Sequence, residues 1–196
     1  MRAMTRFALA YEGGPVAVRY PRGGSPAMPA SDPHGEIKLG QAETLRFGDD
    51  VALIALGAGV EIALAAADLL AERGVEATVL NARFCRPLDE GAILDAARRC
   101  GHVVTVEDGV IRGGFGSAVL ELLAAQGVSV PVSAVGLPDQ FVEHGPIPVL
   151  RDLVGLTAED VAAKALDLLE SSAPVLLSQT NGHGRRTDAM TTERAA

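Results

Sequence analysis

Residues 51–81 read VALIALGAGVEIALAAADLLAERGVEATVLN, and this stretch decides the fold class. It opens with a continuous apolar run from Val51 to Leu56, which predicts a buried strand. Small and apolar residues then predict a helix from Val60 to Leu70, which Arg73-Gly74 ends before a second apolar strand, Ala77 to Leu80. Strands that are apolar throughout indicate parallel pairing under helices on both faces.

The same alternation continues toward residue 170. Asp89 is a good N-cap, and Thr157-Ala-Glu-Asp160 is close to a capping box. The further elements that we predict are helices from Asp89 to about Cys100, Gly116 to Gln126 and Thr157 to Leu169, and strands Val103 to Val106 and Pro131 to Val135. The sequence therefore predicts an α/β domain of three layers with a mostly parallel sheet over residues 36–170.

The two ends of the chain differ from this regular part. Residues 1–11 have the spacing of a short helix, and Val16 to Tyr20 alternate like a strand. One helix and one strand cannot bury a core, so we interpret residues 1–23 as the remnant of a preceding domain. Residues 24–35, rich in Gly, Pro and Ser, are predicted to be a linker, and residues 171–196 a disordered tail.

Composition excludes several classes of protein. Hydrophobic residues make up 48% of the chain, which excludes a wholly disordered protein, and the net charge of -8 argues against nucleic-acid binding. No apolar run reaches the length of about 18 residues that a membrane span needs, and no signal peptide is recognisable. Cys85 and Cys100 fit no metal or redox motif. We expect a soluble, cytoplasmic protein with two reduced thiols.

Two glycine-rich turns invite binding hypotheses. The turn after Leu56 lacks the third small residue of a dinucleotide fingerprint, because Ile62 stands there, and Asn81 replaces the acidic residue that should end the next strand. Gly113 to Ser117 precede a helix whose amides suit an anion, although glycines that let the loop pass close to another chain explain this segment at least as well. The adjacent Glu107-Asp108 pair is expected to lie in a solvated loop, since neighbours on a strand point oppositely.

The segment with most chemical promise is Arg19-Tyr-Pro-Arg22. Two guanidinium groups flank a proline-fixed turn, and such groups suit phosphate or carboxylate oxygens. Two solvated arginines on a surface turn are the alternative. No histidine has a partner at metal spacing, and no catalytic triad can be assembled from the sequence.

Four segments, in the same order and spacing, resemble the C-terminal part of the 1-deoxy-D-xylulose-5-phosphate synthase family, which belongs to the transketolase class. They are GPVAVRYPRG at 14–23, NARFCRPLD at 81–89, VTVEDGVIRGGFGSAV at 104–119 and GLPDQFVEHG at 136–145. The resemblance covers roughly residues 1–170. It implies a transketolase C-terminal-like domain that follows the end of a pyrimidine-binding domain.

The resemblance also implies an activity. The family condenses pyruvate with glyceraldehyde 3-phosphate, with loss of carbon dioxide, and it uses thiamine diphosphate and magnesium. The resemblance makes Arg19 the first and Arg22 the second choice to bind the acceptor's phosphate. The family's G-D-G motif and its catalytic glutamate and histidines are not found here, so we expect no catalytic residue, no metal site and no cofactor binding in this chain alone.

Several readings of the chain stay open. It is expected to act as a homodimer or with a partner chain that carries the missing N-terminal domains and binds small-molecule substrates. The alternatives are a free-standing dimerisation or ligand-binding module without catalysis, and the C-terminal domain of another transketolase-like thiamine-diphosphate enzyme. Pro146 and Pro148 stand where the family has a polar helix start, and they are expected to delay or disrupt that helix.

Overall fold

The computed structural model describes residues 2–20 and 37–172. The predicted linker at 24–35, Arg22, and the predicted tail beyond Ser172 lie outside the described residues. The strands are β1 (Glu43–Arg46), β2 (Val51–Leu56), β3 (Ala77–Asn81), β4 (Val103–Val110) and β5 (Val132–Leu137). The helices are α1 (Arg2–Ala10), α2 (Gly59–Ala71), α3 (Glu90–Cys100), α4 (Phe115–Ala125), α5 (Ile147–Leu153) and α6 (Ala158–Ser172).

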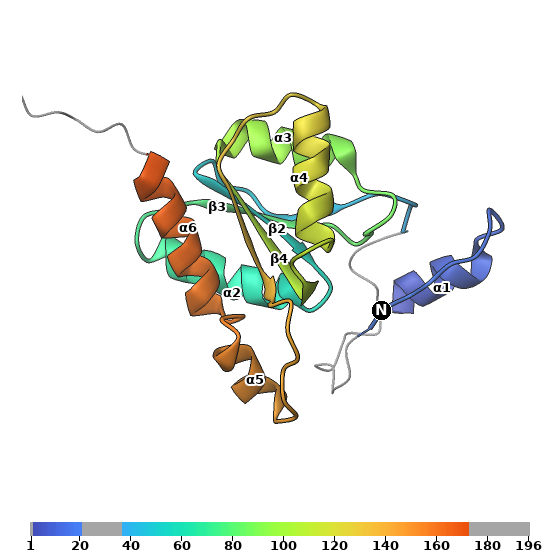
Figure 1. Cartoon of the computed structure of the whole chain (residues 1–196). Coiled ribbons are helices and arrows are strands. Elements are labelled where there is room, and N and C mark those ends of the chain that lie inside the picture. Colours follow the sequence, from blue (N-terminus) through green and yellow to red (C-terminus); the bar gives the residue numbers. More distant parts are fainter. Residues whose placement is uncertain (1, 21–36, 173–196) are drawn as a thin grey trace, which may run out of the picture.

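The strands form one sheet in the order β1-β3-β2-β4-β5. The pairs β2–β3, β2–β4 and β4–β5 are parallel, and β1 alone in this sheet runs antiparallel, along β3. Helices α2 and α6 cover one face of the sheet and α3 and α4 the other, which gives the predicted three layers (Figure 1). The predicted fold class is therefore confirmed.

Two apolar cores lie on opposite faces of the sheet. Leu53 packs with the α2 and α6 side, and its neighbour Ile54 packs with the α3 and α4 side. Both are fully buried, as expected for a central strand whose successive side chains alternate between faces. Gly59 permits the close approach of α2, since a Cβ there would lie 2.7 Å from the carbonyl oxygen of Val106.

The predicted helix starts are confirmed by side-chain caps. Asp89 accepts a hydrogen bond from the amide of Ala92, at 3.0 Å. Thr157 and Asp160 bond reciprocally, the Asp160 amide to Thr157 Oγ1 and the Thr157 amide to Asp160 Oδ2, both at 3.2 Å. Asp160 thus takes the part that Glu or Gln usually has in a capping box.

One predicted strand is absent, one strand was not predicted, and one helix forms where prolines were expected to delay or disrupt it. No strand forms from Val16 to Tyr20, because these residues lie along no described strand that could supply a ladder of hydrogen bonds. Strand β1 was missed because it is short, carries charged side chains at both ends, and has only partial burial at the sheet edge. Helix α5 does form at Ile147, since Pro146 and Pro148 occupy the cap and first turn, where no intrahelical amide bond is lost.

Candidate functional site

The candidate site lies at the carboxyl edge of the parallel sheet, where β4 runs on to Val110 instead of ending at Val106. Glu107, expected in a solvated loop, is only 4% exposed. Its carboxylate accepts hydrogen bonds from the amides of Phe115, at 2.9 Å, and Gly116, at 2.8 Å. These charge-assisted bonds at the N-terminus of α4 offset the cost of burying the carboxylate, and they correct the prediction.

Glycines make the space that the Glu107 carboxylate occupies. A Cβ on Gly114 would lie 2.5 Å from Oε2 of Glu107, and a Cβ on Gly109 would lie 2.9 Å from the same oxygen. A Cβ on Gly136, in the neighbouring strand β5, would lie 3.0 Å from the Glu107 Cγ. The glycines around this carboxylate are therefore explained by close packing inside the chain.

The four amides from Gly113 to Gly116, just before and at the start of α4, all bond to groups of this chain. The amide of Gly113 donates to Ser117 Oγ at 3.0 Å, and that of Gly114 donates to the carbonyl of Ile111 at 3.3 Å. The next two amides bind Glu107. The structure gives these glycines a different role from either hypothesis, because they make room for Glu107 and the end of β4 within the same chain.

Arg19 reaches this edge from the other end of the chain. Its Nη2 donates to the carbonyl oxygen of Asp108, the residue next to Glu107. Its Nη1 lies 3.6 Å from the position that a Cβ on Gly109 would take. The guanidinium group is exposed and rests against the Asp108-Gly109 backbone. Arg22, the second predicted phosphate ligand, lies outside the described residues.

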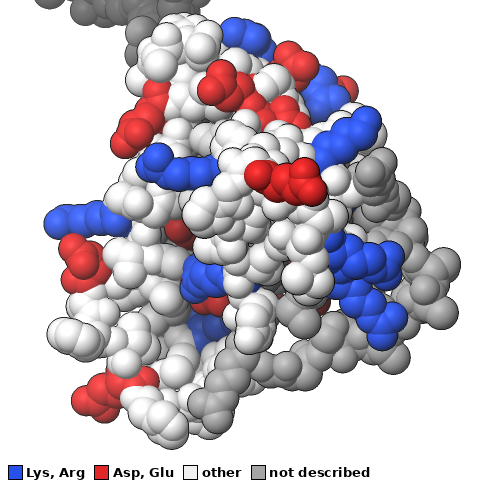
Figure 2. Space-filling view, turned by 90° about the vertical axis from the view of Figure 1, so that its right-hand side faces the viewer, with Lys and Arg blue, Asp and Glu red and all other residues white. Residues whose placement is uncertain are grey.

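Helix α1 touches the domain through a second contact. The ring of Phe7 meets the ring of Phe84 edge to face, with centroids 5.6 Å apart. Helix α1 buries no residue, lies to one side of the domain in Figure 1, and leaves Leu9 84% exposed. Figure 2 views the molecule from that side and shows acidic and basic side chains interspersed among large uncharged areas. An amphipathic helix with exposed apolar residues is typical of a segment that packs on further structure.

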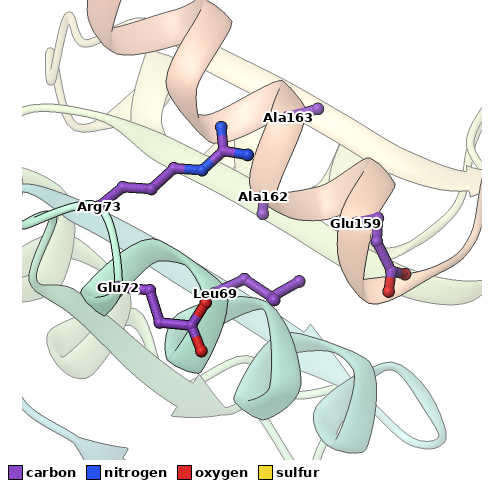
Figure 3. Close-up of a pocket in the computed structure, with 6 residues that line it drawn as sticks. All are labelled: Leu69, Glu72, Arg73, Glu159, Ala162 and Ala163. Carbon is purple, nitrogen blue, oxygen red and sulfur yellow. The ribbon is translucent and has the colours of Figure 1, made fainter.

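Other parts of the described chain offer less for chemistry. The pocket in Figure 3 has a volume of about 160 Å³ and lies between α2 and α6, with the Arg73 side chain extended toward α6. Its lining consists of Leu69, Glu72, Arg73, Glu159, Ala162 and Ala163, which include no nucleophile with an adjacent base. Among residues 2–20 and 37–172, no group of three or more His, Cys, Asp or Glu side chains could hold a metal.

The two cysteines differ in environment. Cys85 is exposed and Cys100 is buried, and both are free thiols. Burial raises the pKa of the Cys100 thiol above its ordinary value, because the thiolate would lose hydration there. This makes Cys100 a poor nucleophile at neutral pH. No helix of the described ranges combines the length and the apolar character that crossing a bilayer requires.

The sequence placed Glu107 at the end of a strand, but its burial and its bonds to α4 were missed, although a signal was present. A carboxylate at the end of an apolar strand was followed, eight residues later, by the glycine-rich start of a helix. Such a helix start attracts an anion, and an internal carboxylate at this spacing satisfies it.

Comparison with known proteins shows what this arrangement is similar to. The 1-deoxy-D-xylulose-5-phosphate synthase of Thermomicrobium roseum is 52% identical over 169 residues, which are 86% of this chain and 27% of that protein. Synthase 1 of Geobacter sulfurreducens is 51% identical over 164 residues, which are 83% of this chain and 26% of that protein. The chain thus spans about a quarter of the length of the curated relatives it matches.

A solved structure and a family model agree with these relatives. A split-gene transketolase, described as an inactive beta4 tetramer, is 37% identical with a TM-score of 0.79, covering 86% of this chain and 54% of that one. The model for the transketolase C-terminal domain matches residues 40–161, which hold the whole sheet and the Glu107 edge. The chain therefore belongs to the transketolase C-terminal domain family.

Proposed function

We propose that this chain is the C-terminal part of a 1-deoxy-D-xylulose-5-phosphate synthase. That enzyme condenses pyruvate with glyceraldehyde 3-phosphate and releases carbon dioxide, and its product is a precursor of isoprenoids, thiamine and pyridoxal. The observation that carries the proposal is the identity of 52% to the Thermomicrobium roseum synthase over 86% of this chain. The four quoted sequence segments support the same assignment.

We infer that the start of α4 does not hold the diphosphate of the thiamine diphosphate that the family uses. The glycine-rich start of α4 suits a diphosphate in principle, but its amides are bonded to Glu107 and to neighbouring groups. A second carboxylate or phosphate there would also be repelled by the Glu107 charge. In the proposal, the cofactor and the metal are held by the N-terminal domains, which a partner chain in the cytoplasm supplies.

Within the complete enzyme, Arg19 binds the phosphate of the acceptor substrate, with Arg22 as the second ligand. The exposed guanidinium of Arg19 lies at the carboxyl edge of the parallel sheet, where ligands of such folds gather. A guanidinium has five N–H donors, enough to bind a phosphate while one donates to Asp108. The contact with Asp108 supports a defined position for the group.

Calorimetry with the cofactor tests the assignment of roles to the chain and its partner. Thiamine diphosphate and magnesium are titrated into this chain, into the candidate N-terminal chain from the same genome, and into their mixture. We expect no binding to this chain alone, and binding with turnover in the mixture. Binding by this chain alone would contradict the proposed division of roles. No binding in any of the three titrations would favour the free-standing module. Turnover with other donor and acceptor substrates would favour another transketolase-like enzyme.

Steady-state kinetics of the reconstituted enzyme test Arg19. Arg19→Ala should raise the KM for glyceraldehyde 3-phosphate about 10- to 100-fold, the loss expected for a charge-assisted hydrogen bond, and leave the KM for pyruvate unchanged. Arg112→Ala is the matched control, because the Arg112 side chain is 84% exposed on the loop after β4. An unchanged KM for the phosphorylated substrate in Arg19→Ala would refute the role of this residue.

A further inference from the structure

The carbonyl that holds Arg19 belongs to the residue next to a buried anchor. Glu107 is fixed by bonds to two amides of α4, so the peptide that follows it has little freedom to rotate. The next residue is Asp108, and its main-chain carbonyl accepts the hydrogen bond from Arg19. The orientation of the Asp108 carbonyl is thus determined from inside the domain.

The packing around the anchor makes its position specific. The Glu107 side chain is enclosed by glycine backbone: a Cβ at Gly109 or Gly114 would come within 3.0 Å of its carboxylate, and a Cβ at Gly136 of β5 would lie 3.0 Å from its Cγ. The same glycine backbone also meets Arg19, whose Nη1 lies 3.6 Å from a Cβ position on Gly109. The end of β4 therefore contacts both the buried carboxylate of Glu107 and the exposed guanidinium of Arg19.

We propose that Glu107 is a positioning residue for Arg19. It fixes the Asp108-Gly109 segment of β4, and this segment fixes the guanidinium of Arg19 in the orientation that a phosphate ester requires. The benefit for a phosphorylated substrate rests on the proposed function of Arg19, whereas the positioning contact itself does not. A guanidinium held in place loses less side-chain entropy when it binds an oxyanion.

Limited proteolysis of the full chain tests the positioning contact without cofactor or partner. Trypsin must take the Arg19 side chain into its own specificity pocket, so the bond to Asp108 protects the Arg19–Tyr20 peptide. Glu107→Gln places an amide NH₂ against an amide N–H of α4 and should loosen the end of β4. We expect cleavage after Arg19, measured by mass spectrometry relative to cleavage after Arg6, to accelerate about threefold to tenfold.

Glu121→Gln is the matched control, since it makes the same chemical change at an exposed position of α4. It should leave the rate of cleavage after Arg19 unchanged. Circular dichroism establishes that each variant is folded. If Glu107→Gln does not fold, Gly109→Ala replaces it, because its Cβ would displace the carboxylate and reach the guanidinium. An unchanged cleavage rate in a folded variant of either kind would overturn the proposal.

Kinetics of the reconstituted enzyme separate positioning from general stability. Glu107→Gln should raise the KM for glyceraldehyde 3-phosphate about threefold to tenfold, with the KM for pyruvate unchanged. In the Arg19→Ala background the same substitution should add nothing, because the residue through which it acts is gone. Additive effects would overturn the proposal. If Arg19→Ala leaves the KM unchanged while the cleavage result holds, the phosphate role fails and the positioning contact stands.

Discussion

Replacing Asp89 by alanine should destabilise the domain, because this carboxylate makes two hydrogen bonds to backbone amides. The Oδ1 atom of Asp89 accepts from the amide of Ala92, at 3.0 Å, and caps α3. Its Oδ2 atom accepts from the amide of Ala42, at 2.8 Å, just before β1. One side chain thus joins a helix start to the segment that leads into the antiparallel edge strand.

The magnitude follows from these two bonds. Loss of an N-cap costs about 1 kcal/mol, and loss of a charge-assisted bond to a partly buried amide costs about 1.5 kcal/mol more. We therefore expect Asp89→Ala to lower the free energy of unfolding by about 2–3 kcal/mol. Asp89→Asn should lose about half as much, because its side-chain oxygen can still accept from one of the two amides.

Urea denaturation, followed by circular dichroism, measures this loss. With a slope near the middle of the usual range, the midpoint should fall by about 1 M urea. Asp95→Ala is the control, since it makes the same change at an exposed position of the same helix and should change stability by less than about 0.5 kcal/mol. Equal losses in Asp89→Ala and Asp95→Ala would refute the reasoning, because the cap and the bond to Ala42 would then contribute nothing.

Further measurements test the packing and the two thiols. Gly116→Ala should lower the free energy of unfolding by about 2–3 kcal/mol in urea denaturation, since its Cβ would lie 2.6 Å from the buried Thr105 Oγ1. Gly91→Ala, whose Cβ would have its nearest contact at 3.7 Å, should raise it by about 0.5 kcal/mol, and equal effects of the two substitutions would contradict the packing. A thiol reagent should modify Cys85 rapidly and Cys100 only on unfolding. Because burial raises the pKa of Cys100, its stabilising contribution is complete below the ordinary value of 9.0 and is lost as pH rises toward the folded value. Cys100→Ala should therefore lose less stability than the unsubstituted chain between neutral and alkaline pH, and an identical pH profile would contradict this.

The sequence by itself determined the fold class, most elements and both helix caps. Strands β2 and β3 are apolar on both faces, and that pattern is compatible with little besides a parallel sheet under two helical layers. Caps such as Asp89 and Thr157 bond to amides only three residues away, so they can be predicted from the sequence alone. The quoted motifs identified the family for the same reason, since each is a local string.

What only the tertiary structure decided concerns groups that are distant in sequence. The environment of Glu107 depends on α4 and on Gly136 of the neighbouring strand, and its burial is stable only because their backbone comes so close. Strand β1 exists because β3 offers it a free edge, and Val16 to Tyr20 form no strand because no described edge lies beside them. The contact between Arg19 and Asp108 spans 89 residues of sequence, and a hydrogen bond over that separation exists only once the chain has folded.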